Sequence, residues 1–216
     1  FMPIVDSLAF YLVAVPAVLI VGIGKGGFAG GLGILAVPLL ALAVSPLQAA
    51  GIMLPILCVM DITGVRAWLH KWDRTYMARL LPGAIVGIVV GALTFRFVNE
   101  EFMKLLIGLL ALVFSLNYWL KGRVKIKPSG LRLPDSVGAS FWSGLSGYTS
   151  FVAHAGGPPL MIYILPKNLD KSVMVGTITI YFAVVNYVKL IPYALLGQLD
   201  TENLLTSLVL APVAVV

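Results

Sequence analysis

The stretch VGIGKGGFAGGLGILAVPLL, residues Val21–Leu40, combines an apolar background with one lysine and repeated glycines. Gly22, Gly24 and Gly27 satisfy the GxGxxG spacing of a dinucleotide-binding turn, which requires a preceding strand and a soluble βαβ unit. The whole chain, however, is 60% hydrophobic and 11% charged, with a mean hydropathy of +1.01. These values are far from globular averages and are typical of a membrane protein. We therefore interpret the GxGxxG match as coincidental.

Charge-free segments long enough to enter a bilayer recur along the chain. They cover residues 7–24, 26–60, 80–95, 105–120 and 136–166. A helix needs about 20 apolar residues to span a bilayer. The sequence therefore predicts an all-α, polytopic integral membrane protein without a soluble domain. The chain starts at Phe1 and stops inside an apolar run at Val216, so we expect it to be incomplete at both ends.

Most of the positive charge lies in two loops. The first contains Arg66, His70, Lys71, Arg74 and Arg79, and the second contains Lys121, Arg123, Lys125, Lys127 and Arg132. Both loops are expected on the cytoplasmic side, because short cytoplasmic loops of membrane proteins are enriched in Lys and Arg. We interpret them as topology signals. The expectation is a multi-pass protein of the cell inner (cytoplasmic) membrane, in contact with the lipid bilayer and without a nucleic-acid partner.

The sequence lacks catalytic and metal-binding patterns. Cys58 is the single cysteine, and His70 and His154 are the only two histidines. No HExxH motif and no nucleophile elbow occur, and a cysteine-based zinc site needs several thiolates. We therefore expect no enzyme activity, no metal and no cofactor.

The segment after the first glycines is duplicated. GLGILAVPLLALAVSPLQAAGIMLPILCVMD, starting at Gly31, aligns without a gap to GGPPLMIYILPKNLDKSVMVGTITIYFAVVN, starting at Gly156. Each copy is predicted to hold a helix ending in glycines, a short helix, a long helix and a fourth helix. The short helices, residues 34–44 and 158–165, reach about half-way across a bilayer. They are therefore expected to form half-helices within hairpins.

The two copies are expected to have opposite orientations. The long helix 48–72 runs into the first basic loop, whereas its partner 172–198 starts beside lysines and ends at acidic residues. A helix over residues 102–120 supplies the odd crossing that inversion requires. The predicted units are repeat 1 (residues 1–98), a linking helix with its basic loop (99–136) and repeat 2 (137–216). Inverted repeats with broken helices are the architecture of secondary transporters.

The glycines of the two hairpins are the first candidate site. A turn inside the bilayer exposes backbone groups, which is tolerated only where they are buried or line a cavity. The half-helices that follow would point their positive N-terminal ends at the same place, which favours an anion. Close helix packing is the alternative, and it is the preferred interpretation of Gly83, Gly87 and Gly91, which recur every four residues. The glycines assigned to the site are Gly26, Gly27, Gly30, Gly31, Gly33, Gly156 and Gly157.

Polar residues at membrane depth are the second candidate site. Asp61 and Asn186 occupy equivalent midpoints of the two long helices. An ionised aspartate costs about 3 kcal/mol at the centre of a membrane helix, so Asp61 is expected to have a partner or to be protonated. Lys25 and Lys189 are the candidate partners. We assign Asp61 and Lys189 to ion coupling, and Asn186 and Lys25 to the solute. A structural ion pair for Asp61 and a snorkelling Lys25 are the alternatives.

The second hairpin, TSFVAHAGGPP from residue 149, adds titratable and hydroxyl groups. His154 is the candidate for proton coupling, because an unperturbed histidine titrates near neutral pH. A satisfied hydrogen-bonding role is equally open for a single histidine. Tyr148, Thr149 and Ser150 precede it and are expected to offer hydroxyl groups to the solute.

These residues resemble a known family. The chain resembles the TauE/SafE family of sulfite and organosulfonate exporters and 4-toluene sulfonate uptake permeases. The shared pattern is two glycine-rich hairpins, each followed by a Pro/Leu-rich half-helix and a long helix with a glycine near its start. The matching positions are residues 26–33 with Pro38 and Gly51, and residues 155–159 with Gly176. Residues 152–154 depart from the usual glycine run. The resemblance implies transport of sulfite, sulfoacetate or related sulfonates and carboxylates, driven by ion gradients.

The sequence thus predicts a secondary active transporter for a small anion. The hairpins would meet at mid-membrane, and one repeat would rock against the other. An anion channel built on the same half-helix site is the alternative. The sequence leaves open the exact solute, the direction of transport and the coupling ion. It also leaves open whether the hairpins cross fully or partially and whether the protein assembles into a homo-oligomer.

Overall fold

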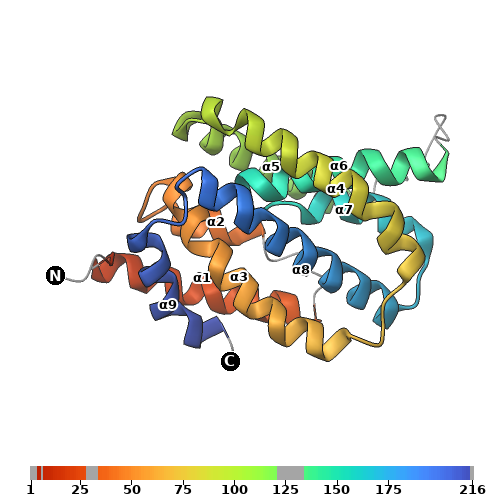
Figure 1. Ribbon diagram of the computed structural model, residues 1–216, viewed down its shortest axis with the longest axis horizontal. Helices are drawn as coiled ribbons and strands as arrows, with labels where there is room; N and C mark the ends of the chain where they lie inside the picture. The colour runs from red at the N-terminus through yellow and green to blue at the C-terminus, as the bar shows by residue number, and fades with distance from the viewer. Residues whose placement is uncertain (1–3, 6, 28–33, 121–133, 215–216) are drawn as a thin grey trace.

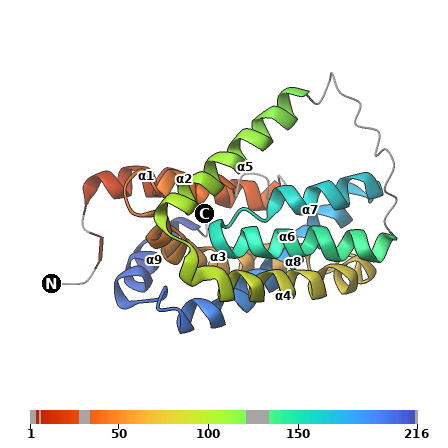
Figure 2. The ribbon, with the colours of Figure 1, turned by 90° about the horizontal axis from the view of Figure 1, so that it is seen from above.

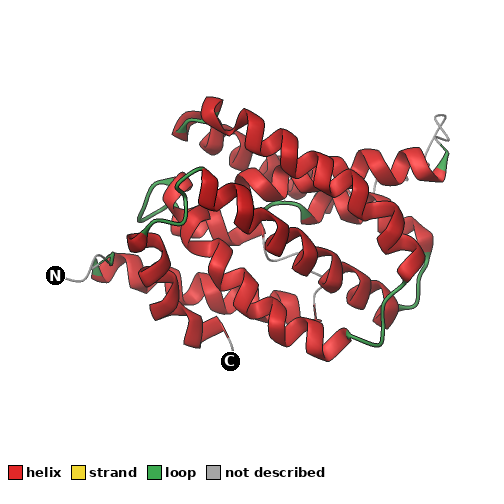
Figure 3. Cartoon of the chain, viewed as in Figure 1, coloured by secondary structure: helices red, strands yellow, loops and turns green. Residues whose placement is uncertain are grey.

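The computed structural model describes residues 4–5, 7–27, 34–120 and 134–214, and all regular structure within them is helical (Figures 1 and 3). Four of the described helices are long and apolar enough to cross a membrane: Leu8–Lys25, Pro46–Trp68, Arg74–Phe97 and Lys171–Leu195. The all-helical, membrane-spanning fold predicted from hydropathy is therefore confirmed.

Within the described ranges, four α-helices precede α5 and four follow it. The first half contains α1 (Leu8–Gly27), α2 (Ala36–Leu40), α3 (Pro46–Trp68) and α4 (Arg74–Thr94), which continues as a 3-10 turn over Phe95–Phe97. The link is α5 (Glu100–Leu120). The second half contains α6 (Asp135–Ala153), α7 (Gly157–Ile164) with a 3-10 turn over Leu165–Lys167, α8 (Lys171–Leu195) and α9 (Thr201–Ala214).

Capping side chains set the starts of the long helices. The Asp73 carboxylate accepts hydrogen bonds from the backbone N–H groups of Thr75 (2.7 Å) and Tyr76 (3.0 Å), so α4 begins at Arg74 rather than at residue 80. Such caps satisfy N–H groups that have no partner within the helix. The half-helix expected over residues 34–44 is shorter than predicted, because α2 covers only Ala36–Leu40 and turns follow it.

The second hairpin returns to the side from which it starts. Asp135, the first residue of α6, accepts hydrogen bonds from the Tyr163 hydroxyl at 3.2 Å and from the Lys167 amine at the end of α7. Arg79 of α4 forms a further ion pair with this carboxylate at 2.6 Å. The hydrogen bond from Lys167 lowers the pKa of Asp135 below its ordinary value. This part of the molecule, which also holds Lys71 and Arg74, is called the basic end here, and the opposite part with Asp200 and Glu202 the acidic end.

The long helices α3 and α8 cross in opposite directions, in contact through two repeat-equivalent glycines. A methyl group on Gly51, near the start of α3, would lie 2.7 Å from the carbonyl oxygen of Gln198, which follows α8. A methyl group on Gly176, near the start of α8, would overlap the carbonyl oxygen of Lys71, which follows α3. Each helix therefore begins where the other ends, as inversion of the two copies requires.

The fourth helix of each copy packs into the other copy. Helix α4 lies along α6 (Figure 2), where a methyl group on Gly87 would overlap the Gly144 carbonyl and one on Gly147 would overlap the Ala84 carbonyl. Helix α9 packs against α1 and α3, and the Ser207 hydroxyl donates to the Ile52 carbonyl at 2.7 Å. We call α1, α2, α3 and α9 the first helix group, and α4, α6, α7 and α8 the second helix group.

Substitution of Gly87 by alanine is expected to destabilise the protein by about 1 to 3 kcal/mol, because the methyl group forces two backbones apart. Gly144→Ala, in the same helix pair, is the matched control, because its methyl group would meet the Gly83 carbonyl at an ordinary 3.5 Å. Thermal unfolding of the two variants in detergent measures the difference. Equal melting temperatures would contradict a close α4–α6 contact.

Candidate functional site

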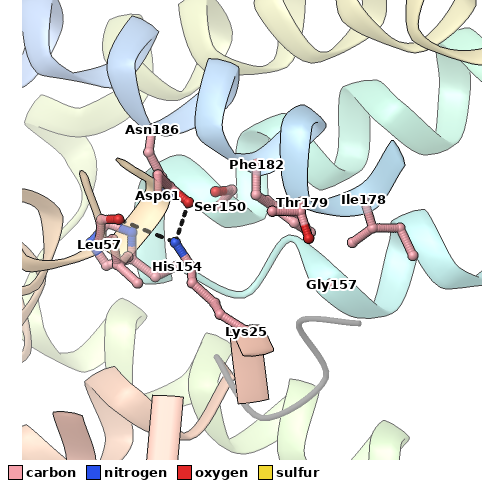
Figure 4. Close-up of a pocket in the computed structure, with 10 residues that line it drawn as sticks. All are labelled: Lys25, Leu57, Asp61, Ser150, His154, Gly157, Ile178, Thr179, Phe182 and Asn186. Carbon is pink, nitrogen blue, oxygen red and sulfur yellow. Dashed lines mark hydrogen bonds and ion pairs between the residues drawn. The ribbon is translucent and has the colours of Figure 1, made fainter. Parts of the chain in front are cut away.

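A pocket lies at the interface of the two helix groups, between α3 and α8. Its lining residues are Lys25, Leu57 and Asp61 from the first group, and Ser150, His154, Gly157, Ile178, Thr179, Phe182 and Asn186 from the second (Figure 4). Both groups thus contribute to one cavity, and residues predicted from both repeats meet in it.

The Asp61 carboxylate is the centre of the polar contacts in this pocket. Its side chain is 1% exposed, and Lys25 from the end of α1 lies 2.5 Å from Oδ1. The same Lys25 ammonium donates to the Leu57 carbonyl at 3.2 Å, one turn earlier on α3 (Figure 4). Asp61 therefore has the cationic partner that a carboxylate at membrane depth requires.

Asp61 also contacts its repeat equivalent. The Asn186 amide nitrogen donates to Asp61 Oδ2 at 2.7 Å, so each carboxylate oxygen has one donor. This bond fixes the orientation of the amide, because the reverse orientation would set the amide oxygen against a carboxylate oxygen. The Asn186 Oδ1 atom is buried and has no hydrogen-bond partner within the described residues. The two positions paired by the sequence repeat are therefore joined by a hydrogen bond across the pocket.

Lys189 forms its hydrogen bonds at the end of α6 and does not line the pocket. Its amine donates to the Ser150 carbonyl (3.0 Å), the Ser150 hydroxyl (3.1 Å) and His154 Nδ1 (2.8 Å). The Tyr193 hydroxyl, one turn further along α8, donates to the Phe151 carbonyl at 2.6 Å. The last carbonyls of a helix lack partners within the helix, and inside a bilayer they need protein donors. Helix α8 supplies these donors to α6.

His154 closes the second hairpin with both of its ring nitrogens engaged. The residue has a left-handed backbone with φ of 52°, a conformation that ends helices and is most often taken by glycine. Nδ1 accepts from Lys189, and Nε2 lies 2.9 Å from the Ala50 carbonyl. Because a carbonyl only accepts, Nε2 carries the hydrogen and the ring is neutral in this arrangement. A proton can reach Nδ1 only when Lys189 moves away.

The start of α7 offers few backbone donors to a solute. Gly157 lines the pocket, but Pro158 and Pro159 follow it and have no N–H group. The Ser146 hydroxyl donates to the Gly156 carbonyl at 2.7 Å and holds the turn in place. The N–H groups available at this helix end are therefore those of Gly156 and Gly157, together with the favourable helix dipole.

The remaining predicted site residues lie in different places. The Thr149 hydroxyl donates to the Leu145 carbonyl of its own helix at 2.9 Å, and the Tyr148 backbone faces Gly87 of α4, so neither residue lines this pocket. Gly26 and Gly27 are the last residues of α1. The predicted Gly30, Gly31 and Gly33 lie outside the described residues.

Three pocket residues were missed by the sequence analysis: Leu57, Ile178 and Phe182. Leu57 contributes through its carbonyl group, which no side-chain pattern reveals. Thr179 lies two turns before Asn186 on one helical stripe with Lys189 and Tyr193, a spacing that predicts donors lining a path. The structure places Thr179 in the pocket. Its hydroxyl makes no hydrogen bond within the described part of the chain, which leaves it free for a solute.

Replacing Asn186 by leucine is expected to lower stability by about 1.5 to 3 kcal/mol, because a buried carboxylate oxygen loses its donor. Thr179→Val is the matched control on the same helix, since valine keeps the shape and the threonine hydroxyl has no internal partner. Thermal unfolding without solute measures both variants. A loss of stability in Thr179→Val that equals the loss in Asn186→Leu would contradict this division of roles.

Comparison with known proteins adds one finding. The model of the family described as sulfite exporter TauE/SafE matches residues 14–216, nearly the whole chain. No curated protein and no solved structure matches the chain significantly. The family match covers both hairpins, both long helices and the pocket between them. The chain therefore belongs to the sulfite exporter TauE/SafE family of membrane transporters.

Proposed function

We propose that this protein is a secondary active transporter that moves a small anion across the cytoplasmic membrane by alternating access. The solute class is sulfite, sulfoacetate and related organosulfonates or carboxylates, in line with the sulfite exporter family. The observation that carries the proposal is the pocket between α3 and α8. There Lys25, the Thr179 hydroxyl and the start of α7 surround one cavity.

The donors in this pocket fit an oxyanion. Lys25 carries three N–H donors and uses two of them on Asp61 and Leu57, which leaves one for a solute. Thr179 adds a free hydroxyl, and Gly156 and Gly157 add backbone N–H groups at a positive helix end. Sulfite and sulfonate groups carry several acceptor oxygens, which such convergent donors can bind together.

Packing supports a particular division into moving parts. The prediction that one repeat rocks against the other would require α4 to leave α6, although their backbones touch along glycines. The two helix groups defined above keep this contact intact. They meet mainly along α3 and α8, where the pocket lies. We therefore propose that the first helix group moves against the second, with the connections 69–73 and 196–200 as hinges.

Cross-linking tests this division. Val65 of α3 and Val184 of α8 line the same surface groove between the helix groups. Joining cysteines at these positions with a short bismaleimide is expected to abolish transport. Joining cysteines at positions 79 and 135, within the second helix group, is expected to leave more than half of it. Loss of transport in both cross-linked proteins, or in neither, would contradict the proposed parts.

The proposed transport activity is tested in proteoliposomes. Sulfite is expected to accumulate when an ion gradient is imposed and to exchange with unlabelled sulfite on the opposite side. An anion channel, the alternative function, would conduct sulfite without accumulation coupled to such a gradient and without exchange.

Lys25→Gln is expected to reduce transport at least tenfold, because the solute loses its cation. Lys104→Gln, whose exposed ion pair lies on α5, is the control. Transport that survives Lys25→Gln would contradict the proposed site.

A further inference from the structure

The pocket is electrically balanced without a solute. Lys25 contributes one positive charge and Asp61 one negative charge, and the two groups lie 2.5 Å apart. An anion that binds the remaining N–H donor of Lys25 shares this cation with Asp61, and it also meets the repulsion of the carboxylate. At membrane depth an additional net charge is costly. Binding of an anion therefore requires a compensating positive charge.

Lys189, the second buried lysine, does not supply this charge. Its three N–H donors are used on two atoms of Ser150 and on His154, which hold the end of α6. It is not among the residues that line the pocket. Moving it toward a solute would leave the Ser150 carbonyl and the His154 ring without this donor.

We propose that the solute anion binds together with one proton, and that the proton is taken up by Oδ1 of Asp61. This inference rests on the proposed transport function. An O–H bond forms at Oδ1, the hydrogen bond between Lys25 and Asp61 breaks, and the Lys25 ammonium forms a new one to the anion. Lys25 keeps its own proton. The empty pocket and the pocket loaded with a monoanion then have the same net charge, so loading adds no charge at membrane depth.

The groups around Asp61 suit a proton better than a metal cation. Asn186 presents its N–H group to the carboxylate, whereas a metal cation needs oxygen atoms. Among the described residues, only Leu57 O and Asp61 Oδ1 converge on the position of the Lys25 ammonium, and hard cations take about six oxygen ligands. A proton needs a single oxygen atom, which the departure of Lys25 makes available.

The other titratable side chains near Asp61 are two lysines, a thiol, a phenol and an imidazole. Lys25 approaches from α1, Cys58 lies on α3 itself, Tyr187 and Lys189 come from α8, and His154 from the second hairpin. Tyr187 donates to the Cys58 carbonyl at 3.2 Å, and His154 Nδ1 accepts from Lys189. Asp61 is the one carboxylate among the residues that line the pocket. It is therefore the group able to accept the proton.

A second pocket gives this carboxylate a route toward the basic end. It lies between α1, α3 and α9 and extends to Trp68 at the end of α3. Lys25 is the residue common to both pockets. Movement of Lys25 therefore connects the two spaces at Asp61. Because the anion and the proton bind together, they cross the membrane in the same direction.

Isothermal titration calorimetry with methanesulfonate, in buffers of different ionisation enthalpy, counts the protons taken up. Methanesulfonate stays ionised, so every proton taken up belongs to the protein. We expect one proton per anion, and affinity falling about tenfold per pH unit on the alkaline side. Asp61→Asn, which mimics the protonated acid, is expected to bind with pH-independent affinity and no proton uptake. Asp135→Asn, which alters a carboxylate paired to lysine outside the pocket, is expected to keep wild-type uptake.

The outcomes separate this inference from the proposed function. If the wild type binds methanesulfonate without proton uptake, the inference is overturned and the transporter proposal stands. The same conclusion follows if a sodium gradient, and not a proton gradient, drives accumulation. Absence of binding of both methanesulfonate and sulfite overturns both. The double variant Lys25→Gln/Asp61→Asn, which keeps the shape of the pair without its charges, is expected to fold and to bind no anion. Strong binding by this variant also overturns the inference.

Discussion

The requirement that a carboxylate at membrane depth be surrounded by donors determines much of this structure. Asp61 obtains its two donors from two other helices, Lys25 of α1 and Asn186 of α8. For these contacts to form, the first hairpin must deliver the end of α1 to the middle of α3. Helix α8 must also cross α3 so that their midpoints coincide. The same rule governs the second hairpin, where Lys189 and Tyr193 satisfy the carbonyls at the end of α6.

The sequence predicted the parts of the fold that depend on hydropathy and on the repeat. The all-helical membrane fold follows from composition, and the alignment of Asp61 with Asn186 anticipated two residues that meet directly. The need for a cationic partner identified Lys25. The first residues of the helices were harder to predict from the sequence, because a local contact determines them. The Asp73 side chain caps α4 and places its start inside the basic loop. The faces of α6 could not be read from a charge-free segment, so the positions of Tyr148 and Thr149 became visible only through its packing on α4.

The pocket lies between the two helix groups that are proposed to move against each other. Lys25 and Asp61 belong to one helix group, whereas Asn186, Thr179 and Gly157 belong to the other. A solute held by both groups necessarily changes the contacts between them. The hydrogen bond from Asn186 to Asp61 and the contact of His154 with the Ala50 carbonyl also join the two groups. The residues proposed to recognise the charge of the solute therefore also hold the interface together.

The exchange of fourth helices has a consequence for how such a protein can arise and assemble. A chain containing a single copy would lack the helix that covers its own hairpin, because α4 covers α6 and α9 covers α1. It could complete its structure only with a second copy inserted in the opposite orientation, each lending its last helix to the other. Fusion of two such copies demands an odd number of crossings between them, the role that the sequence predicts for the helix over residues 102–120. The present chain has the organisation of an antiparallel, helix-swapped dimer contained in one polypeptide.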